Sequence, residues 1–408
     1  MKSYWFYLEP YVYVSIIDKS VFIYNTLDGQ HLKSKDSFTH NTISQLKEVT
    51  GGVIELNEEH LKDDTLYSFI QQIRNCFMGD LIDASLSQGK PIQFTPILNI
   101  QTDIKRMQMI SERSVGEQIM LNLNEIIFFT DNPSSLPNKY YPSNIPFEWE
   151  KPKSIQFKYV ESIISQIPHS VAENLSLSIV TKNFAGLENQ EDLINILNKT
   201  NIKKKIHLYY RNIISEPIFN VNKLSLTLNV DFPFDKQKFE KVNSQLKERA
   251  KTEELNIIFF ITSSQDVDEA EKIIEEYNIT EYTFIPFYTG SNLNFFKENV
   301  YLDEDDLFMD PVSMKNIFLH QSLNIESFGK LYVFPDEGVY SSLFSEKLGS
   351  LTQDTLLQLL YKEFDSSQTW FKIRDYKPCN NCHLQWLCPP PSSYEALLEK
   401  NNLCHVCL

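Results

Sequence analysis

The chain has 408 residues and a formal net charge of -16, with 42% hydrophobic and 13% aromatic residues. A chain of this length is expected to form two or three domains, each with its own core, and the aromatic-rich composition excludes a disordered protein. The acidic balance argues against a nucleic-acid partner, because binding to nucleic acid requires a basic face that displaces counterions.

The opening residues are aromatic, but Glu9 and Pro10 interrupt them, so we expect no signal peptide. No stretch has the roughly 18 apolar residues that a membrane-spanning helix needs, and no membrane partner is expected. The cysteines are bunched and do not form the spread framework of a secreted disulfide protein, which suits a reducing compartment. The sequence therefore predicts a cytoplasmic protein.

Residues 1–90 predict a compact module of short strands and helices. Tyr11–Ile17 and Val21–Tyr24 are rich in β-branched and aromatic residues, and Asp28-Gly29 is a strong hairpin signal. The remaining predicted segments of the module are a helix over 40–49, an extended piece over 53–56 and a helical pattern over 57–86.

From residue 92 onward, strands and helices alternate. The predicted strands are 92–100, 125–130, 175–181, 205–210, 224–230, 256–262 and 282–287. The predicted helices lie near 104–122, 154–167, 190–199, 236–251 and 266–277. This repeated order indicates a parallel sheet with right-handed crossovers, either open or closed into a barrel. Leu224–Val230 alternates apolar and polar residues, so its polar face either lines a cavity or belongs to a solvated edge strand.

Two long loops are expected over 131–152 and 288–311. The second contains the acidic run Asp303–Asp306, which lacks the alternating ligands and the glycine of a calcium loop. We interpret this run as a solvated loop, with a docking site for a basic partner as the alternative. A hairpin over 331–340 and a helix over 352–364 follow.

The C-terminal segment holds five of the six cysteines of the chain. They are arranged as Cys379-Asn-Asn-Cys382, Cys388 and Cys404-His-Val-Cys407. A CxxC loop directs two thiolates at one point, so two such loops and a fifth cysteine can supply a four-thiolate zinc site or the ligands of an iron–sulfur cluster. The alternative is that these cysteines are reduced core thiols or disulfides.

Three other residues could be confused with ligands. His383 and His405 lie within the cysteine segment, and we interpret both as neighbours of the metal site and not as ligands. Cys76 lies on an apolar helical pattern and is expected in a core. No P-loop, GxGxxG, HExxH or GxSxG motif is present, so the sequence indicates none of the corresponding nucleotide or hydrolase sites.

Residues 326–408 resemble the SPASM domain, a C-terminal extension of radical-SAM enzymes that modify ribosomally made peptides. The match is carried by the hairpin Gly329–Tyr340 and by the spacing of Cys379, Cys382 and Cys388, and the segment Leu387–Glu395 resembles a narrower group of proteins from bacterial peptide-maturation systems. With Tyr4–Tyr11 and Ile23–Gly29 added, the chain is similar to the pseudo-radical-SAM proteins of bacterial peptide-maturation systems.

The departures from that family matter more than the matches. A radical-SAM enzyme carries CxxxCxxC after its first barrel strand, whereas the corresponding residues here, Ile104–Met109, include no cysteine. The Gly-Gly-Glu stretch that binds S-adenosylmethionine in the family is also absent, and Phe128–Ser135 stands in its place. The resemblance therefore implies a protein that neither binds nor cleaves S-adenosylmethionine, with no catalytic residue.

The family pattern also implies which cysteines bind metal. Cys379, Cys382 and Cys388 correspond to ligands of the second auxiliary cluster, with Cys404 or Cys407 as the fourth ligand. Ser392 stands where a ligand of the first cluster would be, so one metal site is expected instead of two. The expected cofactor is one [4Fe–4S] cluster, with zinc as the alternative.

The N-terminal module resembles the peptide-recognition domains of these systems, which bind a leader peptide as an added strand beside a helix. On this interpretation the groove would lie between the sheet edge and the helical face from Leu61 to Leu81. The alternatives are a plain packing domain and a winged-helix DNA binder, the latter disfavoured by the acidic charge.

The sequence thus predicts an α/β protein of three parts. Residues 1–90 form a peptide-recognition-like module, residues 91–325 a degenerate radical-SAM-type (β/α) partial barrel, and residues 326–408 a reduced, metal-binding SPASM-like domain. The expected function is a non-catalytic accessory protein whose partners are a radical-SAM peptide maturase and its ribosomal precursor peptide. The alternative is an iron–sulfur electron-transfer protein or an enzyme that uses the single auxiliary cluster.

Overall fold

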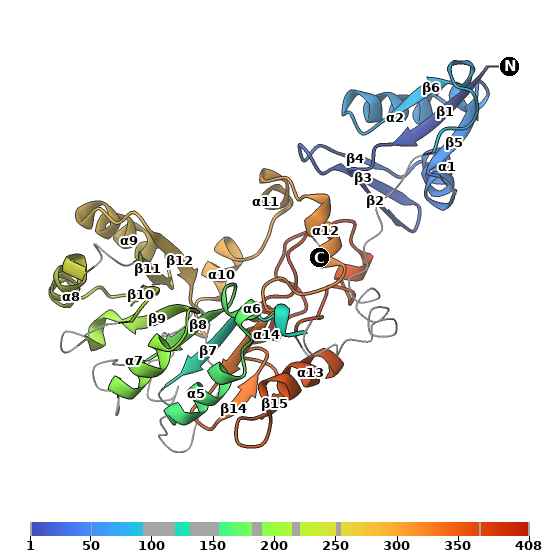
Figure 1. The fold of residues 1–408 in the computed structure, drawn as a ribbon. Coiled ribbons are helices and arrows are strands. Elements are labelled where there is room, and N and C mark those ends of the chain that lie inside the picture. Colours follow the sequence, from blue (N-terminus) through green and yellow to red (C-terminus); the bar gives the residue numbers. More distant parts are fainter. Residues whose placement is uncertain are drawn as a thin grey trace.

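The computed structural model describes residues 2–49, 51–92, 119–130, 155–181, 190–213, 221–249, 254–366 and 369–406. An N-terminal module lies at one end, and a large sheet with its helices forms the rest of the molecule (Figure 1). Helices α11 (Glu304–Met309) and α12 (Met314–His320) and the cysteine segment lie where these two parts meet (Figure 1). Among the described residues, none of the helices combines the length and the apolar character needed to cross a membrane.

The N-terminal module contains two antiparallel sheets of three strands each. The first has the order β5-β1-β6, with β1 (Ser3–Leu8), β5 (Val53–Asn57) and β6 (Gly79–Asp83). The second has the order β2-β3-β4, with β2 (Val12–Ile17), β3 (Ser20–Asn25) and β4 (His31–Ser34). Apolar residues of both sheets and of helices α1 (Ser37–Glu48) and α2 (Asp64–Asn75) form one core.

Two predictions for this module were wrong in detail. Residues 3–8 were not predicted as a strand, yet β1 is the central strand of its sheet. The helical pattern over 57–86 extends too far, because α2 ends before Cys76 and Phe77 takes a left-handed φ of 54°. Leu81 therefore lies on β6 and not on a helix.

Among the described residues, the main sheet has nine strands in the order β12-β11-β10-β9-β8-β7-β13-β14-β15. Six strands that follow one another in the chain are neighbours and parallel: β7 (Glu125–Phe129), β8 (Ser176–Val180), β9 (Lys203–Tyr209), β10 (Leu224–Val230), β11 (Glu254–Ile261) and β12 (Tyr282–Pro286). Helices connect these strands: α5 (Phe157–Ser165), α6 (His169–Ala172), α7 (Gln190–Asn198), α8 (Lys236–Arg249) and α9 (Ser264–Tyr277).

The described strands and helices confirm the predicted alternation and the mostly parallel sheet. The predicted strand 92–100 and most of the predicted helix 104–122 lie outside the described residues, as do Ile104–Met109 and the predicted loop over 131–152. β10 lies between β9 and β11, and both Thr227 and Asn229 are buried, so the interpretation of this strand as a solvated edge was wrong.

The predicted loop over 288–311 contains two helices, α10 (Leu293–Asn299) and α11 (Glu304–Met309). The acidic run is the start of α11: Asp303 and Asp306 form a capping box, and the carboxylates lie where the helix dipole favours negative charge. α12 (Met314–His320) follows, and it brings the chain back to the main sheet.

The predicted hairpin is present and extends the main sheet. β13 (Lys330–Val333) pairs in parallel with β7 and antiparallel with β14 (Gly338–Tyr340), which pairs with β15 (Lys347–Ser350). Gly329 precedes β13 with φ +78°, and a Cβ there would lie 2.2 Å from the Asn122 carbonyl oxygen. Only glycine permits this close approach of the two backbones.

After the hairpin, the predicted helix is present as α13 (Leu356–Ser366), and its apolar side joins the main core. After α13, the regular elements of the described chain are a 3₁₀ turn (Cys379–Asn381) and the short helix α14 (Ser393–Leu397). The cysteine segment is therefore held by turns and by side-chain contacts, and its own helices are short.

Candidate metal centre

Four of the five C-terminal cysteines line one enclosed cavity. Cys379, Cys382, Cys388 and Cys404 contribute to its wall, together with Arg374 and apolar side chains that include Leu302 and Leu384. The described cysteines are all free thiols, so the disulfide alternative finds no support among them.

The first three cysteines are positioned by local backbone hydrogen bonds. The Cys382 amide donates to the Cys379 carbonyl over 3.0 Å, which closes the CxxC turn. The Cys388 amide donates to the Leu384 carbonyl over 2.9 Å, so a second turn returns the chain to the same cavity. This geometry is the reason that Cx2Cx5C spacing brings three sulfurs to one cavity.

Cys404 reaches the cavity through a contact with a distant part of the chain. The Leu302 amide donates to the Leu403 carbonyl over 3.0 Å, and the His405 amide donates to the Leu302 carbonyl over 3.0 Å. These two bonds form a short parallel bridge on either side of Cys404. The side-chain amide of Asn402 also lies 3.1 Å from the Cys404 sulfur.

A buried ion pair supports the wall of the cavity. Arg374 and Glu395 are 7% and 4% exposed, and two hydrogen bonds of 2.6 and 3.2 Å join guanidinium and carboxylate. Arg374 also donates to the carbonyls of Pro389 and Pro390, and one of its nitrogens lies 3.9 Å from the Cys379 sulfur. A guanidinium in this position stabilises negative charge on the sulfurs.

Burial opposes that charge when no cation is present. Burial raises the pKa of the Cys388 thiol to about 12, and burial also raises the pKa of the Cys379 thiol, partly offset by Arg374. Thiolates in such a place need a positively charged partner, and a bound metal supplies one.

The donor set fits a thiolate-bound metal. Four cysteines are the ligands of a [4Fe–4S] cluster and also of a structural zinc ion. The enclosed cavity has a volume of about 20 Å³, which admits a water-sized group. Within the described residues, however, no group of three or more His, Cys, Asp or Glu side chains already has the geometry of an ion site.

The remaining candidate residues lie elsewhere. His383 Nδ1 pairs with the Ser15 hydroxyl at 3.0 Å, and the exposed His405 places Nε2 2.8 Å from the Lys297 carbonyl oxygen, so neither lines the cavity. Cys76 packs against the core of the N-terminal module, as predicted. Cys407 lies outside the described residues.

Ser392, at the position of a family cysteine, caps a helix. Its side chain accepts a hydrogen bond from the Glu395 amide, and the Glu395 carboxylate accepts one from the Ser392 amide. The same carboxylate binds Arg374, so the serine belongs to the frame that holds the cysteine cavity.

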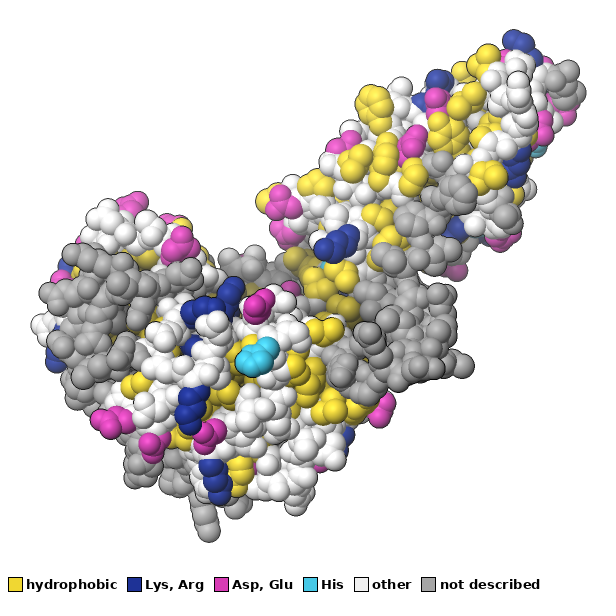
Figure 2. Space-filling view, in the orientation of Figure 1, with side chains coloured by type: hydrophobic (Ala, Val, Ile, Leu, Met, Phe, Trp, Pro, Cys, Tyr) yellow, Lys and Arg dark blue, Asp and Glu magenta, His cyan; other side chains and the backbone are white. Residues whose placement is uncertain are grey.

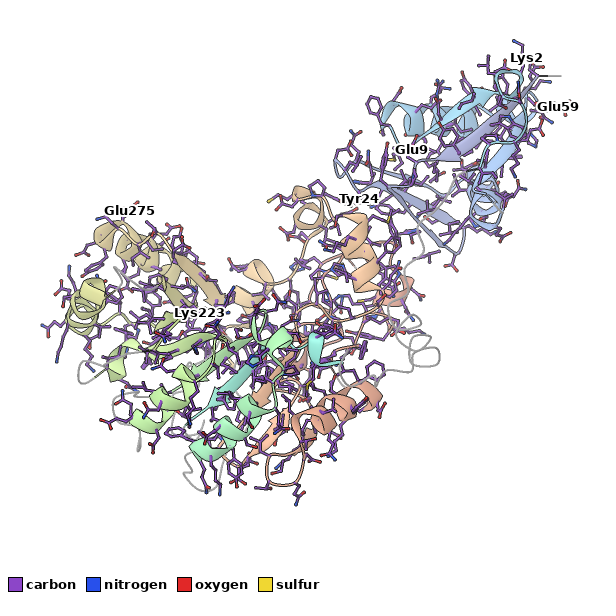
Figure 3. All side chains as sticks on the ribbon, in the orientation of Figure 1. Lys2, Glu9, Tyr24, Glu59, Lys223 and Glu275 are labelled. Atoms are coloured by element: carbon purple, nitrogen blue, oxygen red, sulfur yellow. The ribbon has the colours of Figure 1, made fainter. Side chains whose placement is uncertain are left out.

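The cysteine segment also contacts the N-terminal module, which the sequence did not predict. A small core joins β2 and β3 to α11, α12 and the cysteine segment; its buried members are Tyr13, Phe22, Tyr24, Leu307, Ile317, Leu384 and Leu387. Tyr24 lies at this junction (Figure 3), and its hydroxyl accepts a hydrogen bond from the Val312 amide over 2.8 Å. The one available signal was the unbroken apolar run Val21–Tyr24, which is typical of a strand buried on both faces.

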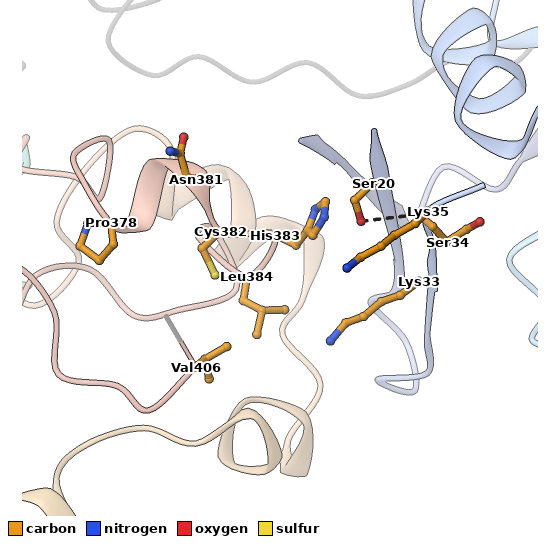
Figure 4. Close-up of a pocket in the computed structure, with 10 residues that line it drawn as sticks. All are labelled: Ser20, Lys33, Ser34, Lys35, Pro378, Asn381, Cys382, His383, Leu384 and Val406. Atoms are coloured by element: carbon orange, nitrogen blue, oxygen red, sulfur yellow. Dashed lines mark hydrogen bonds between the residues drawn. The ribbon is translucent and has the colours of Figure 1, made fainter. Parts of the chain in front are cut away.

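An open cleft lies beside this junction. Lys33, Lys35 and Ser20 come from the β3–β4 hairpin, and Cys382 and His383 come from the cysteine segment opposite (Figure 4). The cleft has a volume of about 670 Å³. Cys382 lines both this cleft and the enclosed cavity.

No family model matches the chain, and no curated protein matches its sequence. Among solved structures, the chain is similar to Streptococcus suis SuiB bound to the precursor peptide SuiA, with 11% identity, a TM-score of 0.46 and 100% of each chain covered. It is also similar to SuiB bound to S-adenosylmethionine, with 11% identity, a TM-score of 0.48, and 98% of this chain and 99% of the other covered. At this identity and these TM-scores, the chemistry of the chain has to be inferred from its own residues.

Proposed function

We propose that the chain is a non-catalytic accessory protein of a radical-SAM peptide maturase, and that it binds the precursor peptide, the enzyme, or both. The position of the thiols carries this proposal. The sequence has no cysteine between Cys76 and Cys379, and four of the C-terminal cysteines line one cavity. Reductive cleavage of S-adenosylmethionine requires a cluster with an open iron, and the parallel sheet has no thiolates to hold one there.

In this proposal the degenerate (β/α) partial barrel serves as a scaffold, and the reduced SPASM-like segment holds one metal centre. Its ligands are Cys379, Cys382, Cys388 and Cys404, since these are the cysteines that line the cavity. We retain a [4Fe–4S] cluster as the expected cofactor because the Cx2Cx5C spacing is that of an auxiliary cluster, with zinc as the alternative. The metal would supply the charge that the buried thiolates need and would fix the loops that carry them.

The exposed apolar side chains of the N-terminal module support a binding role. Apolar side chains are gathered on the face of this module seen in Figure 2. The large apolar residues that are exposed on it are Leu27, Phe38, Tyr67, Phe77 and Leu86. Exposed apolar residues gathered on one part of a surface are typical of a protein-interaction site.

The position of a peptide groove differs from the one that the sequence suggested. The apolar side of α2 is used in the module's own core, because Leu66, Phe69, Ile70 and Ile73 are all buried. Among the described residues, strand edges are available instead at β5 and β6 of one sheet and at β2 and β4 of the other. A peptide added as a strand has to use one of these edges.

Co-purification tests the proposal. The tagged chain is expressed anaerobically with the radical-SAM maturase and precursor peptide of its own system, and complexes are separated by size-exclusion chromatography. We expect a complex with the enzyme, the peptide or both, and no 5′-deoxyadenosine when the purified chain is incubated with S-adenosylmethionine and a reductant. Formation of 5′-deoxyadenosine by the chain alone, or the absence of both complexes, would show the proposal to be wrong.

One observation favours electron transfer as a second candidate function. Cys382 lines the open cleft as well as the cavity, so a cluster bound to it would lie close to solvent. An electron carrier needs this proximity to exchange electrons with a partner. Redox titration followed by electron paramagnetic resonance tests this second function: a carrier must show a reversible one-electron signal, and a redox-silent zinc site would exclude it.

A further inference from the structure

The cleft between the β3–β4 hairpin and the cysteine segment is positively charged in an acidic protein. Its described lining contains Lys33 and Lys35 but no Asp or Glu. The chain as a whole carries a net charge of -16, so this local excess of cations contrasts with the rest of the molecule. In Figure 4 both lysine side chains extend into the space in front of Cys382 and His383.

The two lysines differ in whether an ion pair already neutralises their charge. Lys33 pairs with Glu304 of α11, and its side chain remains 47% exposed. The described residues provide no ion-pair partner for the exposed Lys35. The adjacent carboxylate of Asp36 caps α1, where its Oδ2 accepts a hydrogen bond from the Thr39 amide over 2.8 Å. Lys35 therefore offers the main uncompensated charge of the cleft.

The cleft also has an open strand along one side. Lys33 and Ser34 belong to β4, which is an edge of the sheet β2-β3-β4 among the described residues. An edge strand can bind an extended peptide through main-chain hydrogen bonds. Side chains two residues apart on that peptide would point to the same side, and Lys33 and Lys35 have the matching separation.

We propose that this cleft binds an extended, carboxylate-bearing peptide segment that pairs with the β4 edge and directs its acidic side chains toward Lys35 and Lys33. The volume of about 670 Å³ is within the range of ligand-binding clefts and exceeds what a single small anion fills. This inference rests on the proposed function for the source of the peptide and specifies its chemistry. A segment bound there lies directly beside Cys382.

Peptides of matched sequence test the proposal on the full-length, metal-loaded chain. Fluorescein-labelled (Glu-Thr)3 is titrated with protein and followed by fluorescence anisotropy, with (Gln-Thr)3 as the uncharged control. We expect (Glu-Thr)3 to bind and (Gln-Thr)3 to bind about tenfold more weakly. The glutamine side chains lack the carboxylates that form charge-assisted hydrogen bonds with the lysines. Equal binding of the two peptides, or no binding of (Glu-Thr)3 up to about 1 mM, overturns the proposal.

Two variants with the same change of net charge locate the site. Lys35→Glu is expected to lower the affinity for (Glu-Thr)3 about tenfold. Lys62→Glu, at an exposed position outside the cleft, should change that affinity less than about twofold. Lys35→Gln should give an intermediate loss. Lys35 is exposed, so circular dichroism should show the same fold for all three variants. Equal weakening by Lys35→Glu and Lys62→Glu shows general charge attraction and overturns the assignment.

Inorganic phosphate distinguishes a peptide site from a small-anion site. At constant ionic strength, phosphate is expected to leave (Glu-Thr)3 bound, and displacement by phosphate contradicts a peptide occupant. These measurements need neither the maturase nor its precursor. If the peptide fails to bind, the accessory function is still decided by the co-purification test. If no complex co-purifies, the peptide-binding property of the cleft is still decided by the titrations.

Discussion

His383 and Ser15 form a hydrogen bond of 3.0 Å across 368 positions of the chain. The serine belongs to β2 of the N-terminal module, and the histidine follows Cys382 directly. The His383 ring also stacks on Phe22, with the ring centres 5.9 Å apart. A residue next to a candidate metal ligand therefore helps to hold the N-terminal module in place.

Removal of the Ser15 hydroxyl should weaken this junction. Ser15 is 9% exposed, and its hydroxyl is a partner of both His383 and Tyr13. We expect Ser15→Ala to lower the free energy of unfolding by about 1 kcal/mol, because a buried polar partner is left without its hydrogen bond. Urea unfolding followed by tryptophan fluorescence measures the change. The exposed Ser68 on α2 is the control, and an equal effect of Ser68→Ala would contradict the role given to Ser15.

Single cysteine variants should separate the ligands from the other thiols. We expect Cys379→Ser, Cys382→Ser, Cys388→Ser and Cys404→Ser each to lose bound metal, since each of these residues lines the cavity. Cys76→Ser is the control and should keep the metal, because Cys76 packs in the N-terminal core. Metal analysis and visible absorption of anaerobically purified protein provide the readout and distinguish iron–sulfur from zinc.

The same measurement on Cys407→Ser decides the identity of the fourth ligand. We expect this variant to keep its metal, because Cys404 lines the cavity. Loss of metal from Cys407→Ser together with its retention by Cys404→Ser would reverse the assignment.

The buried pair of Arg374 and Glu395 should be far more important for stability than an exposed pair. Glu395→Gln leaves the Arg374 guanidinium buried without its counter-charge, and we expect a loss of about 3 kcal/mol in the free energy of unfolding. Glu161→Gln removes the partner of Lys199 in a pair whose side chains are 51% and 65% exposed, and it should cost less than about 1 kcal/mol. Similar losses for both variants, measured by urea unfolding, would contradict the prediction.

His207 should make stability depend on pH. Burial lowers the pKa of His207 from 6.5 to about 4, with opposing contributions from Glu125 and Lys205. The unfolded chain then binds a proton at a higher pH than the folded chain does. The contribution of His207 to the free energy of unfolding is fully present above about pH 6.5. It is lost as the pH falls toward 4, and the loss reaches up to about 3 kcal/mol.

A variant can isolate this contribution. His207→Gln should flatten part of the pH dependence between pH 6.5 and 4, and the exposed His169 on α6 provides the control variant His169→Gln. His320 adds a contribution of the same sign, since burial lowers its pKa too, so some pH dependence should remain. A wild-type slope in His207→Gln would show that the buried imidazole is not the cause.

Much of the main sheet could be predicted because its strands carry a local signal. β10 has the predicted bounds residue for residue, since Leu224–Val230 is a short β-rich run between turn signals. β1 carries a local signal as well, since Tyr4–Leu8 is rich in aromatic residues that favour strands, and this signal was not used to predict a strand. Its central place could not be predicted locally, because it comes from pairing with β5 and β6, which lie far along the chain. The end of α2 was also hidden, because Phe77 takes the left-handed conformation that a glycine usually marks.

The candidate site also has a part that local sequence predicts and a part that depends on distant contacts. Cysteine spacing is local information, and the four described C-terminal cysteines do line one cavity. The partners of that cavity are not local: Arg374 meets Glu395, and Leu302 meets Leu403, through the folded chain. The lysines of the cleft were missed for the same reason, since they lie on a hairpin more than three hundred positions from Cys382.

The junction between the N-terminal hairpin and the cysteine segment has a consequence for how the protein is made. Tyr24 contacts Val312 across 288 positions, and Ser15 contacts His383 across 368. The ribosome releases the hairpin long before either partner exists, and contacts between such distant residues form slowly. The hairpin is therefore synthesised well before its partners and is among the last parts of the protein to reach its final position, and until then its aromatic strand lacks the side chains that cover it.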